Sequence, residues 1–164
     1  MSSLAQRLFP SPIGTLRLVA TDSALTGVYF PSEARSAAPD ARPVAAHPVL
    51  DQAARELEQY FEGKRRTFSS PLAAAGTPFQ REVWDALAAI PFGQSRSYAE
   101  IATAIGRSRA VRAVGAANGA NPLSIFVPCH RVIGADGKLT GYGGGLPAKA
   151  WLLGHERKVA ASFP

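Results

Sequence analysis

The amino-acid sequence predicts an α+β protein built from two small domains. Near the start, two β-patterned runs at 16–20 and 25–30 flank a turn-like Thr-Asp-Ser segment, which favours a hairpin. Apolar residues at helical spacing dominate most of the later chain. An Ala-, Gly- and Pro-rich stretch at 71–78 is typical of a linker. We therefore expect one domain at 1–75 and a second at 76–164.

The first domain is predicted to carry one helix in addition to its strands. From Pro48 to Glu62 the apolar side chains fall on one stripe, with acidic and Gln side chains opposite, and Gly63 follows as a stop signal. An Ala-, Pro- and Arg-rich stretch at 31–47 is expected to be an irregular connection, and Thr67–Phe68 to be a short strand.

The second domain opens with a strong helix signal. Thr77-Pro78-Phe79-Gln80 supplies an N-cap, a proline at the first helical position and a capping-box glutamine, and the helix is expected to end before Pro91. Trp84 lies in this helix, and Trp151 lies near the end of the chain. Both are interpreted as core residues rather than as stacking platforms.

A helix-turn-helix is predicted to follow. Ser97-Tyr98-Ala99-Glu100 is a second capping box and opens a short helix through Ile105. Ser108 is expected to cap a second helix, 109–118, and the Gly-Arg-Ser segment that ends in Ser108 joins the two helices. Because many helical proteins contain such corners, the turn alone does not distinguish DNA binding from internal packing.

Positive charge is concentrated in the second domain. The chain has 18 Lys and Arg against 12 Asp and Glu, and residues 76–164 hold ten of these basic side chains and five of the acidic ones. Five arginines and one acid lie from Arg96 to Arg131. Apart from its arginines, the predicted helix at 109–118 carries mostly small side chains, because it is rich in alanine and glycine. A slim basic helix can approach phosphates closely, which favours DNA as the partner, whereas a solvated basic face is the alternative.

Cys129 is the only cysteine of the chain. It therefore cannot form an intramolecular disulfide or supply a multi-cysteine metal site. His130 and Arg131 follow it directly, and cationic neighbours lower the pKa of a thiol and so make it nucleophilic. A small buried hydrophobe is the alternative. An apolar run at 123–127, interpreted as a strand, connects the predicted helix-turn-helix to this cysteine. Such a short connection between a DNA-binding helix and a nucleophile makes sense if the chemistry takes place on a DNA base.

A series of specific motifs runs through residues 77–157. The motifs are Phe79-Gln80-Arg81-Glu82-Val83-Trp84, Pro91-Phe92-Gly93, Ser97-Tyr98, Arg112-Ala113-Val114-Gly115, Ala120-Asn121-Pro122, Pro128-Cys129-His130-Arg131-Val132, Gly141-Tyr142-Gly143-Gly144-Gly145 and Trp151-Leu152-Leu153-Gly154-His155-Glu156. With them, the sequence resembles the 6-O-alkylguanine-DNA alkyltransferases, a family also called methylated-DNA–protein-cysteine methyltransferases. In the first domain, Ser11-Pro12-Ile13-Gly14 is similar to the family's opening strand.

The resemblance implies a fold and a reaction. The fold is an N-terminal α/β roll resembling ribonuclease H, followed by a C-terminal winged-helix-like domain whose helix-turn-helix enters the minor groove of DNA. The reaction is direct damage reversal: the damaged nucleotide is flipped out of the duplex, and the cysteine irreversibly takes the alkyl group from the 6-oxygen of guanine. Transfer from the 4-oxygen of thymine is left open. The sequence shows no second nucleophile to remove the alkyl group, so each molecule is expected to act once.

The resemblance also assigns catalytic roles. Cys129 matches the alkyl acceptor, His130 the histidine that takes the thiol proton through a water, and Glu156 the carboxylate that orients this histidine. Asn121 matches the asparagine that positions the cysteine, and Tyr98 the tyrosine that contacts the flipped guanine and can donate a proton to it. Taken singly, His130 with Glu156 could be a structural pair, and Tyr98 a packing residue at the helix start.

Further residues are implied to contact DNA and the flipped base. Arg112 matches the residue that fills the gap left in the base stack, although a phosphate contact is the alternative. The expected DNA-binding set is Tyr98, Arg109, Arg112, Ala113 and Gly115. The expected substrate pocket consists of Pro128, Val132, Tyr142 and Gly143, with Tyr142 as a wall and backbone groups of residues 129, 132 and 143 hydrogen-bonding the guanine edge.

The expected partner is double-stranded DNA containing 6-O-alkylguanine, bound by a cytoplasmic monomer. No secretory signal or membrane-spanning run is visible, so no membrane association is expected. No cofactor is expected either. Some members of the family bind a structural zinc in the N-terminal domain, but this one has no cysteine there and a single histidine, His47, so we expect no metal.

Three other functions remain alternatives. An alkyltransferase-like protein binds lesions without accepting the alkyl group, but such proteins lack the acceptor cysteine that this chain has at position 129. A DNA-binding regulator with a sensor thiol would usually carry a dimerisation or effector domain, and none is evident. A cysteine hydrolase would turn over repeatedly, whereas the implied reaction stops after one equivalent.

Overall fold

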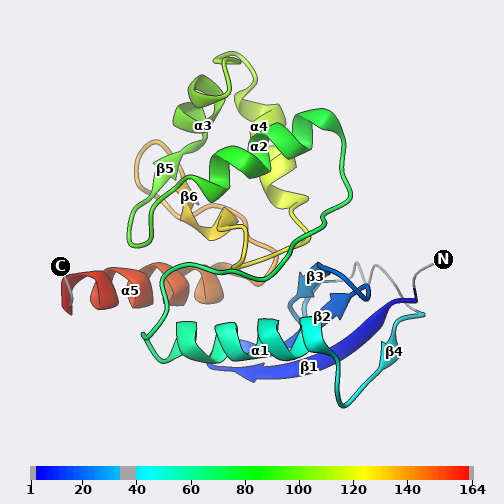
Figure 1. Cartoon of the computed structure of the whole chain (residues 1–164). Coiled ribbons are helices and arrows are strands. Elements are labelled where there is room, and N and C mark those ends of the chain that lie inside the picture. Colours follow the sequence, from blue (N-terminus) through cyan, green and yellow to red (C-terminus); the bar gives the residue numbers. More distant parts are fainter. Residues whose placement is uncertain (1–2, 34–39, 163–164) are drawn as a thin grey trace. The chain divides into compact units, whose positions relative to one another are not determined.

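The computed structural model describes residues 3–33 and 40–162 (Figure 1). The chain folds as two compact units, Met1–Ala75 and Gly76–Pro164, and each unit combines helices with strands. The predicted α+β class is therefore confirmed. Part of the expected connection at 31–47 lies outside the described residues. None of the helices in the described ranges is long and apolar enough to cross a membrane.

The first unit contains a four-stranded sheet in the order β3-β2-β1-β4. Its strands are β1 (Ala5–Ser11), β2 (Gly14–Ala20), β3 (Leu25–Tyr29) and β4 (Arg42–Pro43). β2 pairs antiparallel with both β1 and β3, and β4 lies parallel to β1. The predicted hairpin corresponds to β2 and β3. β1, with the sequence Ala-Gln-Arg-Leu-Phe-Pro-Ser, lacks the apolar alternation that predicts a strand.

Helix α1 (Pro48–Phe61) packs against this sheet. Its buried stripe includes Leu50, Ala53 and Leu57, which recur at helical spacing. The N-cap is His47, whose Nδ1 accepts a hydrogen bond from the backbone N–H of Leu50. The predicted helix is confirmed, and it ends one residue earlier than expected.

The short strand expected at Thr67–Phe68 is wrong, because neither residue lies in a strand. The backbone N–H groups of Ser69 and Ser70 donate instead to the buried carboxylate of Glu56. This side chain of α1 therefore takes the donors that a sheet partner would need, and the segment follows an irregular path.

The second unit is mainly helical. Its elements are α2 (Pro78–Ala88), β5 (Arg96–Ser97), α3 (Tyr98–Ala104), α4 (Val111–Gly119), the 3₁₀ helix η1 (Cys129–Arg131), β6 (Val132–Ile133) and α5 (Leu146–Ser162). Helix α2 packs against α3, α4 and η1, while α5 packs against η1. β5 and β6 form a two-stranded parallel sheet. The predicted helix-turn-helix is present as α3 and α4, which pack against each other (Figure 1).

Local start signals explain where two of these helices begin. At the start of α2, the Thr77 side chain accepts from the N–H of Gln80, and the Gln80 side chain accepts from the N–H of Thr77. At the start of α3, Ser97 and Glu100 form the same reciprocal pair. Both predicted capping boxes are therefore confirmed.

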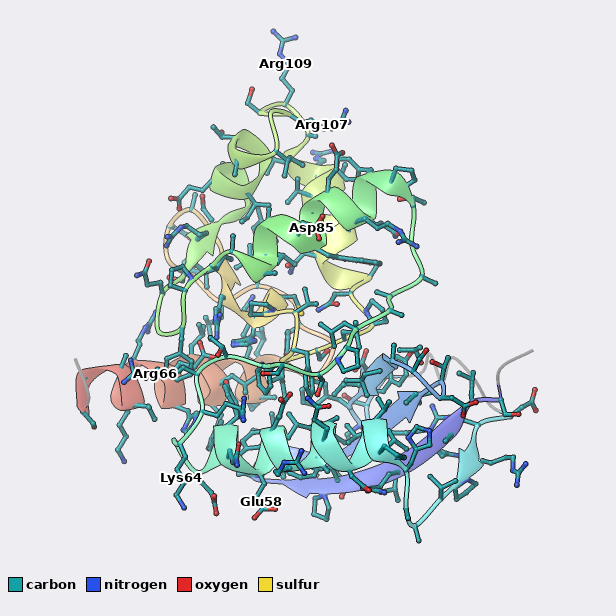
Figure 2. All side chains as sticks on the ribbon, viewed as in Figure 1. Glu58, Lys64, Arg66, Asp85, Arg107 and Arg109 are labelled. Carbon is teal, nitrogen blue, oxygen red and sulfur yellow. The ribbon has the colours of Figure 1, made fainter. Side chains whose placement is uncertain are left out.

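Helix α4 begins differently from the prediction. Its N-cap is Ala110 and no side chain caps it, so the expected cap at Ser108 is wrong. The N–H of Ala110 donates to the carbonyl of Arg107 at 2.8 Å, which closes a turn and leaves Ser108 and Arg109 outside the helix. Figure 2 shows Arg109 at the tip of this turn, with its side chain pointing away from the unit.

The two tryptophans differ in burial. Trp84 is buried in α2 and donates its Nε1–H to the carbonyl of Ala117 at 2.9 Å, which joins α2 to α4. Trp151 is half-buried and stacks on His155 with the ring centroids 4.7 Å apart. The predicted core role is confirmed for Trp84, whereas Trp151 lies at the edge of the core.

Candidate active site around Cys129

Cys129 begins η1 and is 5% exposed. The expected strand before it is wrong: the segment is a buried tight turn, in which the N–H of Val127 donates to the carbonyl of Leu123 at 2.9 Å. Ile125 takes the left-handed conformation in this turn, with φ of 75°. That conformation costs a non-glycine residue roughly 1–2 kcal/mol, so other contacts must hold it in place.

Asn121 supplies those contacts. Its Nδ2 donates to the carbonyl of Val127 at 2.9 Å, and its Oδ1 accepts from the N–H of Leu123 at 3.0 Å. The side chain is buried, so both hydrogen bonds are shielded from water. Asn121 therefore ties the two ends of the turn together and fixes the path of the backbone that leads to Cys129.

The carboxylate of Glu156, on α5, connects His130 and Arg131. Its Oε2 lies 2.7 Å from Nε2 of His130, and its Oε1 lies 2.7 Å from Nε of Arg131. Arg131 makes a second hydrogen bond to Oε2 at 3.1 Å and donates to the carbonyl of Ile90 at 2.7 Å. The N–H of Gly93 adds a longer contact of 3.4 Å to Oε1. All three charged or polar side chains are buried, so each is satisfied by protein rather than by solvent.

The surroundings determine the protonation of this cluster. Burial alone raises the pKa of Glu156, but hydrogen bonds from His130 and Arg131 outweigh it and hold that pKa well below its usual range. Burial lowers the pKa of His130, and the charges of Arg131 and Lys149 lower it further, against the opposing effect of Glu156. His130 is therefore a neutral imidazole at neutral pH and donates from Nε2 to an ionised Glu156.

The other ring nitrogen of His130, Nδ1, is the basic atom of the site. It is buried, and it has no hydrogen-bond partner in the part of the chain that the structure describes. Since the Nε2 proton is bound to Glu156, the free lone pair of the ring lies on Nδ1. His130, which directly follows Cys129, can therefore accept a proton at Nδ1, on the side of its imidazole ring away from Glu156.

Lys149 belongs to this site, and sequence reasoning missed it. It is fully buried in α5, and its Nζ donates to the carbonyl of Thr140 at 3.2 Å. Among residues 3–33 and 40–162 it pairs with no carboxylate, although a buried lysine almost always needs a counter-charge. Burial lowers its pKa, and the charge of Cys129 raises it, so the thiol lies within electrostatic reach. Lys149 precedes Glu156 by seven residues, and this same-face spacing is the signal that could have found it.

Tyr98, the first residue of α3, packs beside α4. A Cβ at Gly115 would lie 3.8 Å from Cδ1 of the Tyr98 ring, so the two helices approach closely at this point. The Tyr98 hydroxyl lies 2.5 Å from Oγ1 of Thr140. Thr140, which sequence reasoning also missed, therefore contacts both Tyr98 and Lys149.

The remaining predicted residues fall into two groups. Of the expected DNA-binding set, Arg109, Arg112 and Ala113 are exposed, and Gly115 is half-buried. Of the expected pocket set, Pro128 and Val132 are buried at the two ends of η1, while Tyr142 is half-buried and Gly143 is exposed in the segment between β6 and α5.

Comparisons with known proteins match both units of the chain. The family model described as the 6-O-methylguanine DNA methyltransferase DNA-binding domain matches residues 78–158. The model of the ribonuclease-like domain of the same family matches residues 4–74. Fold and site thus define a two-domain protein whose DNA-binding part carries a single cysteine, followed directly in sequence by the histidine that is hydrogen-bonded to Glu156.

Relatives match over most of the chain. The methylated-DNA–protein-cysteine methyltransferase of Methanosarcina barkeri is 47% identical over 146 residues, which are 89% of this chain and 92% of that protein. The protein of the same name from Mycobacterium tuberculosis is 49% identical over 160 residues, which cover 94% of this chain and 93% of that protein. The crystal structure of Mycobacterium tuberculosis OGT in complex with DNA matches with a TM-score of 0.87 and 45% identity, and covers 94% of both chains. The chain belongs to the 6-O-methylguanine DNA methyltransferase family, as its motifs predicted.

Proposed function

We propose that the protein repairs alkylated DNA by transferring the alkyl group from the 6-oxygen of guanine to Sγ of Cys129, once per molecule. The observation that carries the proposal is the 2.7 Å hydrogen bond between Glu156 and His130, the residue that follows Cys129 in sequence, which leaves Nδ1 of His130 as a base. The names of the relatives, which are methylated-DNA–protein-cysteine methyltransferases, support the same reaction.

Proton transfer prepares the nucleophile. Nδ1 of His130 takes the thiol proton through a bridging water, and the ionised Glu156 stabilises the imidazolium that forms. The buried ammonium of Lys149 stabilises the thiolate of Cys129. The thiolate then attacks the alkyl carbon, the bond between that carbon and the guanine oxygen breaks, and its electron pair stays with the base. Tyr98 donates a proton to the leaving guanine.

DNA binding brings the base to the thiol. The target atom lies inside the duplex, so the nucleotide must be flipped out before it can react. Arg112 is exposed on α4 and fills the gap in the stack, while Arg109, at the tip of the preceding turn, contacts phosphate. Ala113 and Gly115 keep α4 slim enough to lie close to the groove. The flipped base is assigned to a pocket of Pro128, Val132, Tyr142 and Gly143, and the partner to a duplex containing 6-O-alkylguanine bound by one protein molecule.

Intact-mass measurement tests the proposal. Incubation with a duplex oligonucleotide containing 6-O-methylguanine is expected to add one methyl group, about 14 Da, to Cys129 and then to stop. Cys129→Ser protein is the control and is expected to gain no mass. A protein that binds the duplex fully yet keeps its mass would be the lesion-binding alternative, and repeated turnover would contradict the single-use mechanism.

A further inference from the structure

Thr140 joins two parts of the site that lie far apart in the sequence. Its Oγ1 is 2.5 Å from the hydroxyl of Tyr98, and its carbonyl accepts a hydrogen bond from Nζ of Lys149 at 3.2 Å. Residues 135–138 just before it are exposed, whereas Thr140 itself is half-buried. Contacts on both its side chain and its backbone therefore fix this residue at the end of an otherwise exposed segment.

The backbone and the ring of Tyr98 are both held by neighbouring structure. The capping box of Ser97 and Glu100 sets the start of α3, where Tyr98 is the first residue. Its ring lies against α4 at Gly115. The direction of the O–H bond depends on the hydroxyl of Thr140, which can either accept a hydrogen bond or donate one.

We propose that Thr140 is a positioning residue that controls when Tyr98 gives up its proton; this inference rests on the proposed role of Tyr98 toward the leaving guanine. Either hydroxyl can take either role, and in the proposed sequence the hydroxyl of Tyr98 is the donor and Oγ1 of Thr140 the acceptor before transfer. As the bond between the guanine oxygen and the alkyl carbon breaks, the Tyr98 proton passes to the base, and the Thr140 hydroxyl turns to donate to the phenolate oxygen. His130 then releases the thiol proton to solvent, and solvent returns a proton to Tyr98, so that both groups regain their starting protonation states.

Lys149 keeps the backbone still during this change. Its ammonium binds the carbonyl of Thr140, so the hydroxyl can turn without movement of the chain. Because that hydrogen bond uses the backbone, every substitution at position 140 retains the acceptor. The contribution of the hydroxyl can therefore be measured by itself.

Single-turnover transfer from a 6-O-methylguanine duplex, with the protein in excess, measures this contribution. Thr140→Val keeps the shape and removes the hydroxyl, and we expect the rate to fall about tenfold, which corresponds to about 1.4 kcal/mol in the barrier. Thr140→Ser restores the hydroxyl and is expected to stay within about twofold of the unsubstituted protein. Thr103→Val, at an exposed position of α3, is the matched control and is expected to leave the rate unchanged.

A double-mutant cycle with Tyr98→Phe separates positioning from support of the fold. We expect Tyr98→Phe to slow transfer, and Thr140→Val to have no further effect in that background. We also expect Thr140→Val to change neither the reaction of the thiol with iodoacetamide nor the affinity for the duplex. Equal slowing by Thr140→Val in both backgrounds, or a changed iodoacetamide rate, overturns the inference.

The outcomes also separate this inference from the proposed function. Full activity of Tyr98→Phe overturns the role of Tyr98, and with it the role of Thr140, while methylation of Cys129 still tests the reaction. A slow Tyr98→Phe combined with a fully active Thr140→Val overturns the role of Thr140 alone. If Thr140→Val shows no cooperative melting transition, the pair Thr140→Ala and Thr140→Ser makes the same comparison.

Discussion

Arg131 binds the carboxylate of Glu156 through two nitrogen atoms, with Nε 2.7 Å from Oε1 and Nη2 3.1 Å from Oε2. The same carboxylate accepts a hydrogen bond from Nε2 of His130. Bidentate arginine–carboxylate pairs are among the strong hydrogen-bonded pairs in proteins, so Glu156 stays ionised while His130 stays neutral. The base of the proposed reaction is therefore kept in its proton-accepting form by the arginine next to it in sequence.

We expect Arg131→Gln to raise the pKa of His130. The substitution removes a positive charge that lowers this pKa and leaves Glu156 to act on the imidazole alone. NMR titration of the three histidines measures the pKa, with Arg157→Gln at an exposed position of α5 as the control. Transfer at neutral pH is expected to slow several-fold, because a larger share of the base is protonated. An unchanged or lower pKa would contradict this account.

Glu156→Gln is expected to lower the free energy of unfolding by about 3–5 kcal/mol, because it leaves the buried guanidinium of Arg131 without a counter-charge. Urea denaturation measures the change. Glu82→Gln is the matched control, since Glu82 pairs with Arg107 at 3.1 Å on the surface and its loss is expected to cost less than about 1 kcal/mol. If the two substitutions lowered the free energy of unfolding equally, burial of the Glu156–Arg131 pair would not make its contribution to stability larger than that of a surface pair.

The stability of the protein is expected to fall in acid in two stages. The folded-state pKa of His130 lies below its unfolded value of about 6.5, so the unfolded state takes up the proton first as the pH falls through that value. The folded-state pKa of Glu156 is depressed as well, and its contribution begins to be lost below the unfolded value of about 4.3. Melting temperatures should decline below about pH 7 and more steeply below about pH 5. A constant melting temperature between these two values would argue against a buried neutral His130.

Gly93 and Gly106 offer a matched pair of substitutions. Both have positive φ, +81° and +73°, but a Cβ at Gly93 would lie 2.9 Å from Cβ of Ala160, whereas one at Gly106 would meet nothing within 4 Å. We expect Gly106→Ala to lower the free energy of unfolding by about 1 kcal/mol and Gly93→Ala by roughly 2–3 kcal/mol. Chemical denaturation measures both, and losses of equal size would rule out a packing cost at Gly93.

Arg112→Ala is expected to slow repair of duplex DNA at least about tenfold while sparing the free base. The side chain is exposed on α4, and its proposed role is to fill the gap that a flipped nucleotide leaves. A free 6-O-benzylguanine base leaves no such gap, so its reaction with Cys129 should keep its rate. Arg109→Ala is the comparison variant. Because it loses a phosphate contact, the slope of the logarithm of the DNA-binding constant against the logarithm of the salt concentration should fall in magnitude by about one. Similar losses with duplex and free base would contradict the role of Arg112.

Sequence reasoning predicted the structure best where its cause is local. Each capping box is complete within four consecutive residues, and both helices begin where these residues place them. The family motifs also named His130 and Glu156, which the structure joins by a hydrogen bond. In such cases the interacting groups either lie within one turn of helix or belong to a pattern that the whole family shares.

The prediction was poorest where distant groups compete with local preference. The run at 123–127 is largely apolar, as in a buried strand, but the side chain of Asn121 binds both of its ends and closes it into a turn. Ser108 has good capping chemistry, yet the turn closes before it can cap α4. Thr140 carries no local pattern that marks it, and it joins the site through Nζ of Lys149 and the hydroxyl of Tyr98, which comes from a helix 42 residues earlier.

Lys149 also makes the electrostatics of the protein interior differ before and after the proposed transfer. The thiolate of Cys129 is the anion within reach of this buried ammonium, and a thioether carries no charge. Before transfer, loss of the thiol proton to His130 can supply that anion. After transfer, the ammonium has no thiolate to pair with, so only loss of its own proton or entry of water can lower the cost of burying its charge. A methyl group on Sγ thus removes from a used molecule the one anion that its thiol could supply to Lys149.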